Sequence, residues 1–259
     1  MYDHELQVAK MIALKAGEIM RQYFETDQER QIKSDGTPLT IADTKIHQLV
    51  ATEIALAFPD DVLVSEEGKN QDYGMGRRWL CDPIDGTKAF TWGVPTAMFS
   101  LGLVVDGVPT VGVAYEPMLD KIYWAVKDQP AYCNDQVIKV NQQDLAEGIL
   151  ATISSPYRLR RQSSYIDAFL DYPTRIDLAT FSGAVAKSVR VADGRFVGYI
   201  EELVNNYDIA AVQVIVESAG GKITDMQGRQ LDYSKAFRGC IVSNGTVHEE
   251  LVELCRSNG

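Results

Sequence analysis

The chain has 259 residues, of which 46% are hydrophobic and 24% are charged. This composition excludes global disorder and is typical of a globular protein with a large core. With 25 Lys and Arg against 36 Asp and Glu, the formal net charge is −11. A surface of this sign repels phosphate backbones and anionic lipid, so we expect neither a nucleic acid nor a membrane as partner. An anionic small molecule would bind only where a cation offsets the negative field, which makes a metal site the expected companion of such a ligand.

The N-terminal residues and the cysteines indicate the cellular compartment. Residues 1–5 lack the basic stretch and the apolar run of a signal peptide, and no later window approaches the roughly 20 apolar residues of a membrane-spanning helix. Cys81, Cys133, Cys240 and Cys255 are scattered and form no Cys-x-x-Cys pair, which favours neither a disulfide framework nor a zinc site. We therefore expect a cytoplasmic protein with free thiols.

Two helices are predicted at the beginning of the chain. Over residues 4–24 apolar side chains recur at helical spacing with charged residues between them, which predicts an amphipathic helix. A second helix is predicted over Thr40–Phe58, and Thr40 with Asp43 three residues later resembles a capping box. Pro59 and the two aspartates after it end this helix.

The pattern then changes to short runs of β-forming residues, with Asp106-Gly107 as a hairpin turn. The predicted strands are Val62–Val64, Arg78–Cys81, Met98–Val105, Pro109–Tyr115 and Lys121–Val126. Such a succession predicts a mostly antiparallel sheet. Together with the two helices it forms a predicted N-terminal part over residues 1–145.

After residue 145 strands and helices alternate, which is the pattern of an α/β arrangement. The predicted strands are Ile149–Ser154, Val197–Glu201 and Gly239–Ser243. The predicted helices are Ser163–Leu170, Gly183–Asp193 with Gly194 behind it, Asn206–Ala219 with Gly220-Gly221 behind it, and Val247–Leu254. We expect residues 146–259 to form an α/β subdomain that packs tightly against the first part and completes the site.

The most informative segment is Asp82-Pro83-Ile84-Asp85-Gly86-Thr87, which directly follows an apolar strand. Two carboxylates held by a proline-stiffened turn can converge on one cation at a small cost in conformational entropy. The glycine lets backbone N–H groups approach an anion, and the threonine adds a hydroxyl. An ordinary capped β-turn explains the same residues, because Asp, Pro and Gly are common in turns.

Two further acidic residues occur at element ends. Glu66 follows the strand Val62–Val64, and Asp208 opens the helix that continues from Ile209. A solvated acidic turn and a first-turn residue favoured by the helix dipole are the alternatives for these positions. Taken with Asp82 and Asp85, they form a set of hard oxygen ligands without thiol or imidazole companions. Such a set suits Mg²⁺ or Mn²⁺ rather than Zn²⁺.

With these motifs the chain resembles the inositol monophosphatase superfamily of lithium-sensitive, magnesium-dependent phosphatases. This superfamily includes inositol monophosphatases, archaeal-type fructose bisphosphatases, bisphosphate nucleotidases and histidinol-phosphate phosphatases. The resemblance is carried by residues 82–87 as the first signature, by Glu66-Glu67 upstream, by Asp208–Ala211 with Glu217–Gly221 as the second signature, and by Lys33–Asp43 as the mobile loop and the aspartate after it. In the second signature Tyr207 replaces the usual tryptophan.

The resemblance implies an α+β fold, a layered α-β-α-β-α sandwich of the inositol monophosphatase and fructose bisphosphatase type. It also implies a homodimer that hydrolyses a small phosphate monoester with a water molecule activated by two or three Mg²⁺ ions, with Mn²⁺ as the alternative ion. The implied metal ligands are Glu66, Asp82, the Ile84 carbonyl, Asp85 and Asp208. The implied catalytic residues are Glu66 and the pair Thr87 and Asp43, which would polarise the attacking water. The implied substrate contacts are Asp85, Gly86, Thr87, Gly183, Ala184, Glu201 and Asp208.

The alcohol part of the substrate is less well defined by the sequence. Glu201 stands seven residues before Asp208, as does the glutamate that binds substrate hydroxyls in the inositol enzymes, and it favours a polyol or a cationic group. An exposed charge on an edge strand is the alternative. Lys88, directly after the first signature, is typical of the nucleotidase and histidinol-phosphate branches. Tyr207 is typical of the histidinol-phosphate branch. Ala184, however, departs from the Gly-Gly-Asp of that latter branch.

Inositol monophosphate or a related polyol or sugar phosphate is therefore the expected substrate, with histidinol phosphate or a nucleotide bisphosphate as the alternatives. Arg158, Arg160 and Arg161 could bind a second phosphate, or they could belong to a solvated helix start or a subunit contact. Two functions of another class are a non-catalytic sugar-phosphate-binding protein and a calcium-stabilised structural domain. Thr87 and Asp43 favour catalysis, because a pure binding protein has no need of a water-activating pair.

Overall fold

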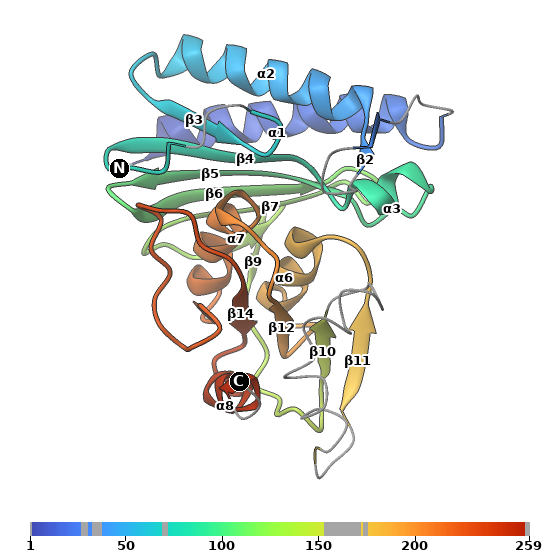
Figure 1. Cartoon of the computed structure of the whole chain (residues 1–259), viewed down its shortest axis with the longest axis vertical. Helices are drawn as coiled ribbons and strands as arrows, with labels where there is room; N and C mark the ends of the chain where they lie inside the picture. Colours follow the sequence, from blue (N-terminus) through green and yellow to red (C-terminus); the bar gives the residue numbers. More distant parts are fainter. Residues whose placement is uncertain are drawn as a thin grey trace.

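The computed structural model describes residues 2–26, 31–32, 38–68, 72–152, 172 and 176–256. Five layers follow one another through the molecule, namely two helices, a seven-stranded sheet, two helices, a five-stranded sheet and one helix (Figure 1). This arrangement confirms the expected α+β class and the α-β-α-β-α sandwich. Among the described residues, no helix is both long and apolar enough to span a bilayer.

The outer helical layer consists of α1 (Asp3–Tyr23) and α2 (Ile41–Ala57), close to the bounds that the periodicity predicts. Both helices bury one apolar face against the seven-stranded sheet, where Trp79, Phe99 and Leu101 are fully buried. Such burial contributes about 1.5–3 kcal/mol for each large apolar side chain. The predicted capping box is present, because Thr40 Oγ1 accepts from Asp43 N while an Asp43 oxygen accepts from Thr40 N.

The seven-stranded sheet has the order β3-β4-β5-β6-β7-β8-β9. Its strands are β3 (Val62–Ser65), β4 (Arg77–Asp85), β5 (Met98–Val105), β6 (Val108–Glu116), β7 (Lys121–Val126), β8 (Ala131–Cys133) and β9 (Gln136–Ile138). Neighbouring strands run antiparallel except β3 and β4, as the sequence predicts for most of this part. Asp106 and Gly107 both have positive φ angles, of 49° and 79°, in the predicted hairpin turn.

One strand is longer than the sequence predicts. Instead of ending at Cys81, β4 continues to Asp85, with an irregularity in its pairing to β5 between Asp82 and Asp85. The helix α3 (Thr87–Thr91), which was not predicted, follows at once. The Asp-Pro-Ile-Asp segment is therefore the end of a buried strand rather than a turn beyond it.

The five-stranded sheet has the order β11-β10-β12-β14-β13. Its strands are β10 (Ile149–Thr152), β11 (Asp177–Thr180), β12 (Gly198–Glu201), β13 (Lys222–Thr224) and β14 (Cys240–Ser243). β10 is parallel to β11 and β12, and β14 is antiparallel to β12 and β13. A separate two-stranded sheet pairs β1 (Gln31–Ile32) with β2 (Pro38–Leu39).

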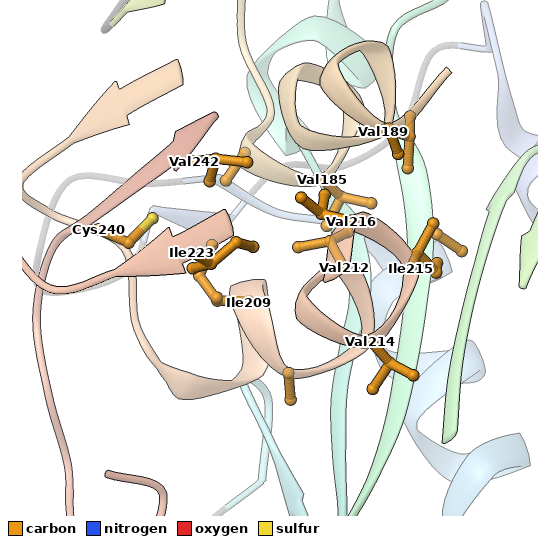
Figure 2. Close-up of a cluster of buried hydrophobic side chains, with 14 of the residues drawn as sticks. Val185, Val189, Ile209, Val212, Val214, Ile215, Val216, Ile223, Cys240 and Val242 are labelled. Carbon is orange, nitrogen blue, oxygen red and sulfur yellow. The ribbon is translucent and has the colours of Figure 1, made fainter. Parts of the chain in front are cut away.

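The middle helical layer joins the two sheets. It contains α6 (Ala184–Ala192), which is followed by Gly194 with φ of 78° as predicted, and α7 (Asn206–Ser218). Figure 2 shows the apolar cluster of these helices, which includes Val185 of α6, Val212 of α7 and Val242 of β14. The last layer is α8 (His248–Arg256), which packs on the other face of the five-stranded sheet through Leu251 and Val252.

Two glycines bring α7 close to the seven-stranded sheet. A Cβ on Gly112 of β6 would lie 2.1 Å from the Ala211 carbonyl oxygen, and one on Gly102 of β5 would lie 2.7 Å from the Ala211 nitrogen. Any larger residue would push the helix away from the strands. This close approach sets the position of the N-terminus of α7, where Asp208 lies, relative to β4 and β5.

Some sequence predictions lie outside the described residues. They are the mobile loop at 33–37, the end of the strand at 153–154, the helix at 163–170, and Arg158, Arg160 and Arg161. The seven-stranded sheet ends at Ile138 and the five-stranded sheet begins at Ile149. The division into subdomains at residue 145 stays a prediction.

Candidate active site

Three aspartates from distant parts of the sequence meet at one place. One carboxylate oxygen from each of Asp82, Asp85 and Asp208 lies within 4.8 Å of the others. Asp82 and Asp85 are buried at the end of β4, and Asp208 is half-buried in the first turn of α7. The sequence predicted that these residues converge, and oxygen atoms at such spacing can share a small divalent cation.

Backbone N–H groups hold each of these carboxylates in place. Asp82 Oδ1 accepts a hydrogen bond from the Ile84 nitrogen at 3.0 Å, and Asp208 Oδ2 accepts one from the Asn205 nitrogen at 2.6 Å in the capping box of α7. Hydrogen bonds to an ionised oxygen are among the stronger ones in proteins. The orientation of both side chains is therefore set by the chain itself.

Asp85 is held by the N-terminus of α6. Its two oxygens accept from the Ala184 and Val185 nitrogens, each at 2.8 Å, across about one hundred residues of sequence. Glycine is required beside it, since Gly183 has φ of 107° and a Cβ there would lie 2.8 Å from Asp85 Oδ2. Ala184, which the family resemblance counts among the substrate contacts, thus donates its backbone N–H to a carboxylate of the cluster.

Gly86 and Gly183 lie against one another in the space between β4 and α6. Gly86 has φ of 84°, and a Cβ on it would lie 3.4 Å from the Gly183 Cα. Gly86 also stands at the N-terminal end of α3, directly before Thr87. The backbone after β4 and the backbone before α6 therefore lie in close contact at the two glycines, with no side chain between them.

Burial and mutual repulsion disfavour the charged forms of the three aspartates. Burial raises the pKa of Asp82 and of Asp208 well above the usual value, and the neighbouring negative charges, first that of Glu66, raise both further. Burial also raises the pKa of Asp85 to about 6, against the hydrogen bonds of α6 and the charge of Lys187. A divalent cation would remove this repulsion, and the all-oxygen donor set fits Mg²⁺.

Glu66 lies beside this cluster but is not one of the three closely spaced residues. It is half-buried directly after β3, where its backbone nitrogen donates to the Cys81 carbonyl of β4 at 3.0 Å. Its charge reaches both Asp82 and Asp208, whose pKa values it raises. The structure thus brings the fourth predicted acidic residue to the same end of β4.

Thr87 and Asp43 have other partners than the ones expected. Thr87 Oγ1 donates to the Ile84 carbonyl at 3.0 Å, and Asp43 Oδ2 accepts from the Thr40 nitrogen and hydroxyl at 2.8 and 2.6 Å. A Thr87–Asp43 hydrogen bond is not among those of the described residues, and the capping box holds only one of the two Asp43 oxygens, Oδ2. Asp43 Oδ1 is buried and has no partner within the described part of the chain. Burial raises the pKa of Asp43 to about 7, and the charges of Glu67 and Glu66 add to this effect.

Glu201 has a buried partner that sequence reasoning missed. Lys187 of α6 donates to Glu201 Oε2 at 3.4 Å and to the Thr152 carbonyl at 3.2 Å. The available signal was a lysine among the Ala and Val residues of the run Ala184–Val189, where a helix was already predicted. Lysine is almost never fully buried unless it is paired, so this position could have been singled out.

Comparison with known proteins identifies relatives over the whole chain. Residues 1–259 match the model of the inositol monophosphatase family. A fructose-1,6-bisphosphatase/inositol-1-monophosphatase of Aquifex aeolicus is 31% identical over 255 residues, covering 97% of this chain and 95% of the relative. A histidinol-phosphatase of Chlorobaculum parvum is 34% identical over 232 residues, covering 87% of each. The solved structure of an IMPase from Thermotoga maritima superimposes with a TM-score of 0.85 at 27% identity, covering 98% of this chain and 97% of that one.

Proposed function

Because the chain belongs to the inositol monophosphatase family of phosphoric monoester hydrolases, we propose that it hydrolyses the phosphate monoester of a small polyol, with inositol monophosphate as the representative substrate. The observation that carries this proposal is the cluster of Asp82, Asp85 and Asp208, with carboxylate oxygens within 4.8 Å of one another. An acidic protein can bind a phosphate dianion at such a cluster only when cations are present.

The family is metal dependent, and the residues present fit Mg²⁺. We assign Asp82, Asp85 and Asp208 as ligands, with Glu66 and the Ile84 carbonyl completing the set. When bound, the cations would neutralise the phosphoryl oxygens, lower the pKa of a water molecule and steady the leaving oxygen in an in-line displacement. The proposal includes two or three ions, with Mn²⁺ as a substitute.

The chain's own residues would then orient the phosphate and the attacking water. We assign the backbone N–H groups of Gly86 and Thr87 to the phosphate, at the end of β4. The Thr87 hydroxyl can accept a proton from water once its own proton passes to a base, and Asp43 Oδ1 is the free acceptor for that proton. A pKa of about 7 suits Asp43 to this role, since a general base works best near the operating pH.

Glu201 is assigned to the substrate's hydroxyls. It lies at the end of β12, its Oε2 atom has protein partners, and its Oε1 atom is left without one among the described residues. A hydroxyl donor of a polyol would satisfy that oxygen. Histidinol phosphate is the second candidate, and it is favoured by the relative of that activity at 34% identity.

Turnover measurements test the assignment. Phosphate release would be followed with Mg²⁺ for inositol 1-phosphate, histidinol phosphate, fructose 1,6-bisphosphate and a nucleoside 3′,5′-bisphosphate. We expect the highest kcat/KM with the inositol ester. A higher kcat/KM for another ester would replace the polyol assignment. Calorimetric binding of inositol 1-phosphate without any release would favour a non-catalytic binding protein instead.

The expected homodimer is also part of the proposal. Light scattering at micromolar concentration measures it directly, and a mass of one chain would contradict it.

A further inference from the structure

A buried lysine lies in the helix that holds Asp85. The side chain of Lys187 is only 2% exposed, in the middle of α6. Its neighbours Val185, Ala186 and Val189 are fully buried. Placing an ammonium group in such surroundings is unfavourable unless an opposite charge and hydrogen-bond acceptors compensate for the lost water. The groups that compensate for the buried charge of Lys187 therefore indicate the role of this residue.

The partners of Lys187 form a closed set around Glu201. Lys187 Nζ lies 3.4 Å from Glu201 Oε2, 3.2 Å from the Thr152 carbonyl oxygen and 4.6 Å from the centre of the Tyr199 ring. The Tyr199 hydroxyl donates to the same Glu201 oxygen at 3.2 Å. The positive charge of the lysine and the negative charge of the glutamate thus cancel within one buried contact.

Glu201 nevertheless keeps one oxygen for another group. Its side chain is 8% exposed, against 2% for Lys187, and its Oε1 atom is buried without a partner within the described residues. A carboxylate oxygen that is left unpaired in the interior requires a hydrogen-bond donor. Because the charge of the carboxylate is already balanced, a neutral hydroxyl supplies what is missing.

Lys187 also lies near the carboxylate cluster. It stands two residues after Val185, whose backbone nitrogen holds Asp85, and its charge lowers the pKa of Asp85. The field of the ammonium group therefore extends from Glu201 to the cluster. A second cation that approached Glu201 Oε1 would meet this field at short range and in a medium of low dielectric constant.

We propose that Lys187 is a specificity-determining residue that cancels the charge of Glu201 and thereby selects esters of uncharged, hydroxylated alcohols over esters of amino alcohols. The inference rests on the proposed function of Glu201 as a contact of the substrate. An unpaired glutamate would accept either a hydroxyl or an ammonium group. With Lys187 beside it, an ammonium group loses its water of hydration and gains no net attraction in return, so the contact is unfavourable for the wrong ligand.

Two esters that differ in one group provide the test. 2-Hydroxyethyl phosphate and 2-aminoethyl phosphate have the same length, and at pH 7.5 only the second carries an ammonium group. We would measure kcat/KM for both with saturating Mg²⁺ and take their ratio. The wild type is expected to prefer the hydroxyl ester at least tenfold, and Lys187→Met is expected to reduce the ratio at least tenfold.

Three further variants separate charge from structure. Lys187→Arg keeps the charge and is expected to keep the preference. Lys222→Met removes an exposed lysine that pairs with Glu249 at 2.7 Å, and its ratio is expected to equal that of the wild type. Glu201→Gln leaves Lys187 uncompensated, so its ratio is expected to rise. Opposite shifts for Lys187→Met and Glu201→Gln would not arise from a general loss of packing.

The outcomes are distinct. A wild type that hydrolyses both esters equally, or an unchanged ratio in Lys187→Met or in Glu201→Gln, overturns the role of Lys187. If Lys187→Met does not fold, the kcat/KM ratio of the wild type and the expected increase of this ratio in Glu201→Gln still test the role of Lys187. Absence of phosphate release from p-nitrophenyl phosphate by the wild type would instead overturn the proposed function, and this inference with it.

Discussion

Replacement of Asp85 by asparagine separates metal binding from folding. Asp85 accepts hydrogen bonds from the Ala184 and Val185 nitrogens and is one of the three clustered carboxylates. Asparagine keeps the shape but loses the charge and one of the two acceptor oxygens. We expect Asp85→Asn to lose turnover at least a hundredfold, while the metal-free fold stays intact or becomes slightly more stable.

Two opposing terms give the expected size of the stability change. Burial first of all raises the pKa of Asp85 from 3.8 to about 6, which at pH 7 destabilises the metal-free fold by roughly 3 kcal/mol. Asparagine removes this term but leaves one buried N–H of α6 without an acceptor, which costs about 1–3 kcal/mol. The net change in the free energy of unfolding is therefore expected to be a stabilisation of about 0–2 kcal/mol at pH 7.

The dependence on pH follows from the raised pKa. The native state binds this proton more tightly than the unfolded chain does, so the stabilising contribution of protonated Asp85 is complete below pH 3.8 and is lost as the pH rises through about 6. The advantage of asparagine over aspartate in metal-free protein should accordingly shrink as the pH falls from about 6 towards 3.8.

Urea unfolding with EDTA or with Mg²⁺ measures both effects. For the wild type, Mg²⁺ at about 100 times its dissociation constant adds about 2.7 kcal/mol to the free energy of unfolding. Asp85→Asn should gain little from the same addition. Asp128→Asn is the matched control, since that aspartate is 84% exposed and lies at a positive φ of 64° that asparagine also tolerates. An equal Mg²⁺ stabilisation in Asp85→Asn and the wild type would refute the assigned ligand.

The remaining predictions concern the neighbours of the cluster. Gly183→Ala is expected to weaken Mg²⁺ binding, because its Cβ would lie 2.8 Å from Asp85 Oδ2, and calorimetry with an unchanged dissociation constant would contradict this. Excess chelator is expected to abolish phosphate release and Li⁺ to inhibit it, so full activity in EDTA would exclude a metal-dependent reaction. Thr87→Ala and Asp43→Asn should each slow turnover roughly 10²- to 10⁴-fold with little change in KM, and the double variant should be hardly slower than the slower single one; multiplicative losses would mean that the two act independently. In the wild type the rate should rise with pH through about 7 as Asp43 loses its proton, and Asp43→Asn should remove that step.

Much of the fold is encoded in local patterns that the sequence displays directly. The bounds of β5 and β7 agree with the predicted ones, and α2 begins at its predicted capping box. Strands β8 and β9, of three residues each, were missed because they are mostly exposed or half-buried and show no apolar alternation. Such strands form because a neighbouring strand supplies the hydrogen bonds, which a local pattern does not reveal.

The acidic residues of the site were predictable, whereas their supports were not. The three clustered aspartates stand at the ends of elements in recognisable motifs, so the sequence predicted that Asp82, Asp85 and Asp208 lie close together. The contact of Asp85 with α6 joins residues about one hundred positions apart, and it depends on how the middle helices pack between the two sheets. The same packing buries Lys187 against Glu201, and for this reason the charge balance around Glu201 becomes visible only in the structure.

Helix N-termini explain how so many carboxylates can be gathered before any cation binds. Asp43, Asp85 and Asp208 each accept backbone hydrogen bonds at the start of a helix, namely α2, α6 and α7. The positive end of each helix dipole partly offsets the charge next to it, and the N–H groups fix the direction of the oxygens. Burial nevertheless raises the pKa of all three, and nearby negative charges raise the pKa of Asp43 and Asp208 further, so a divalent cation would favour their charged forms. Metal binding at this site should therefore complete a preorganised set of ligands rather than drive the folding of the chain.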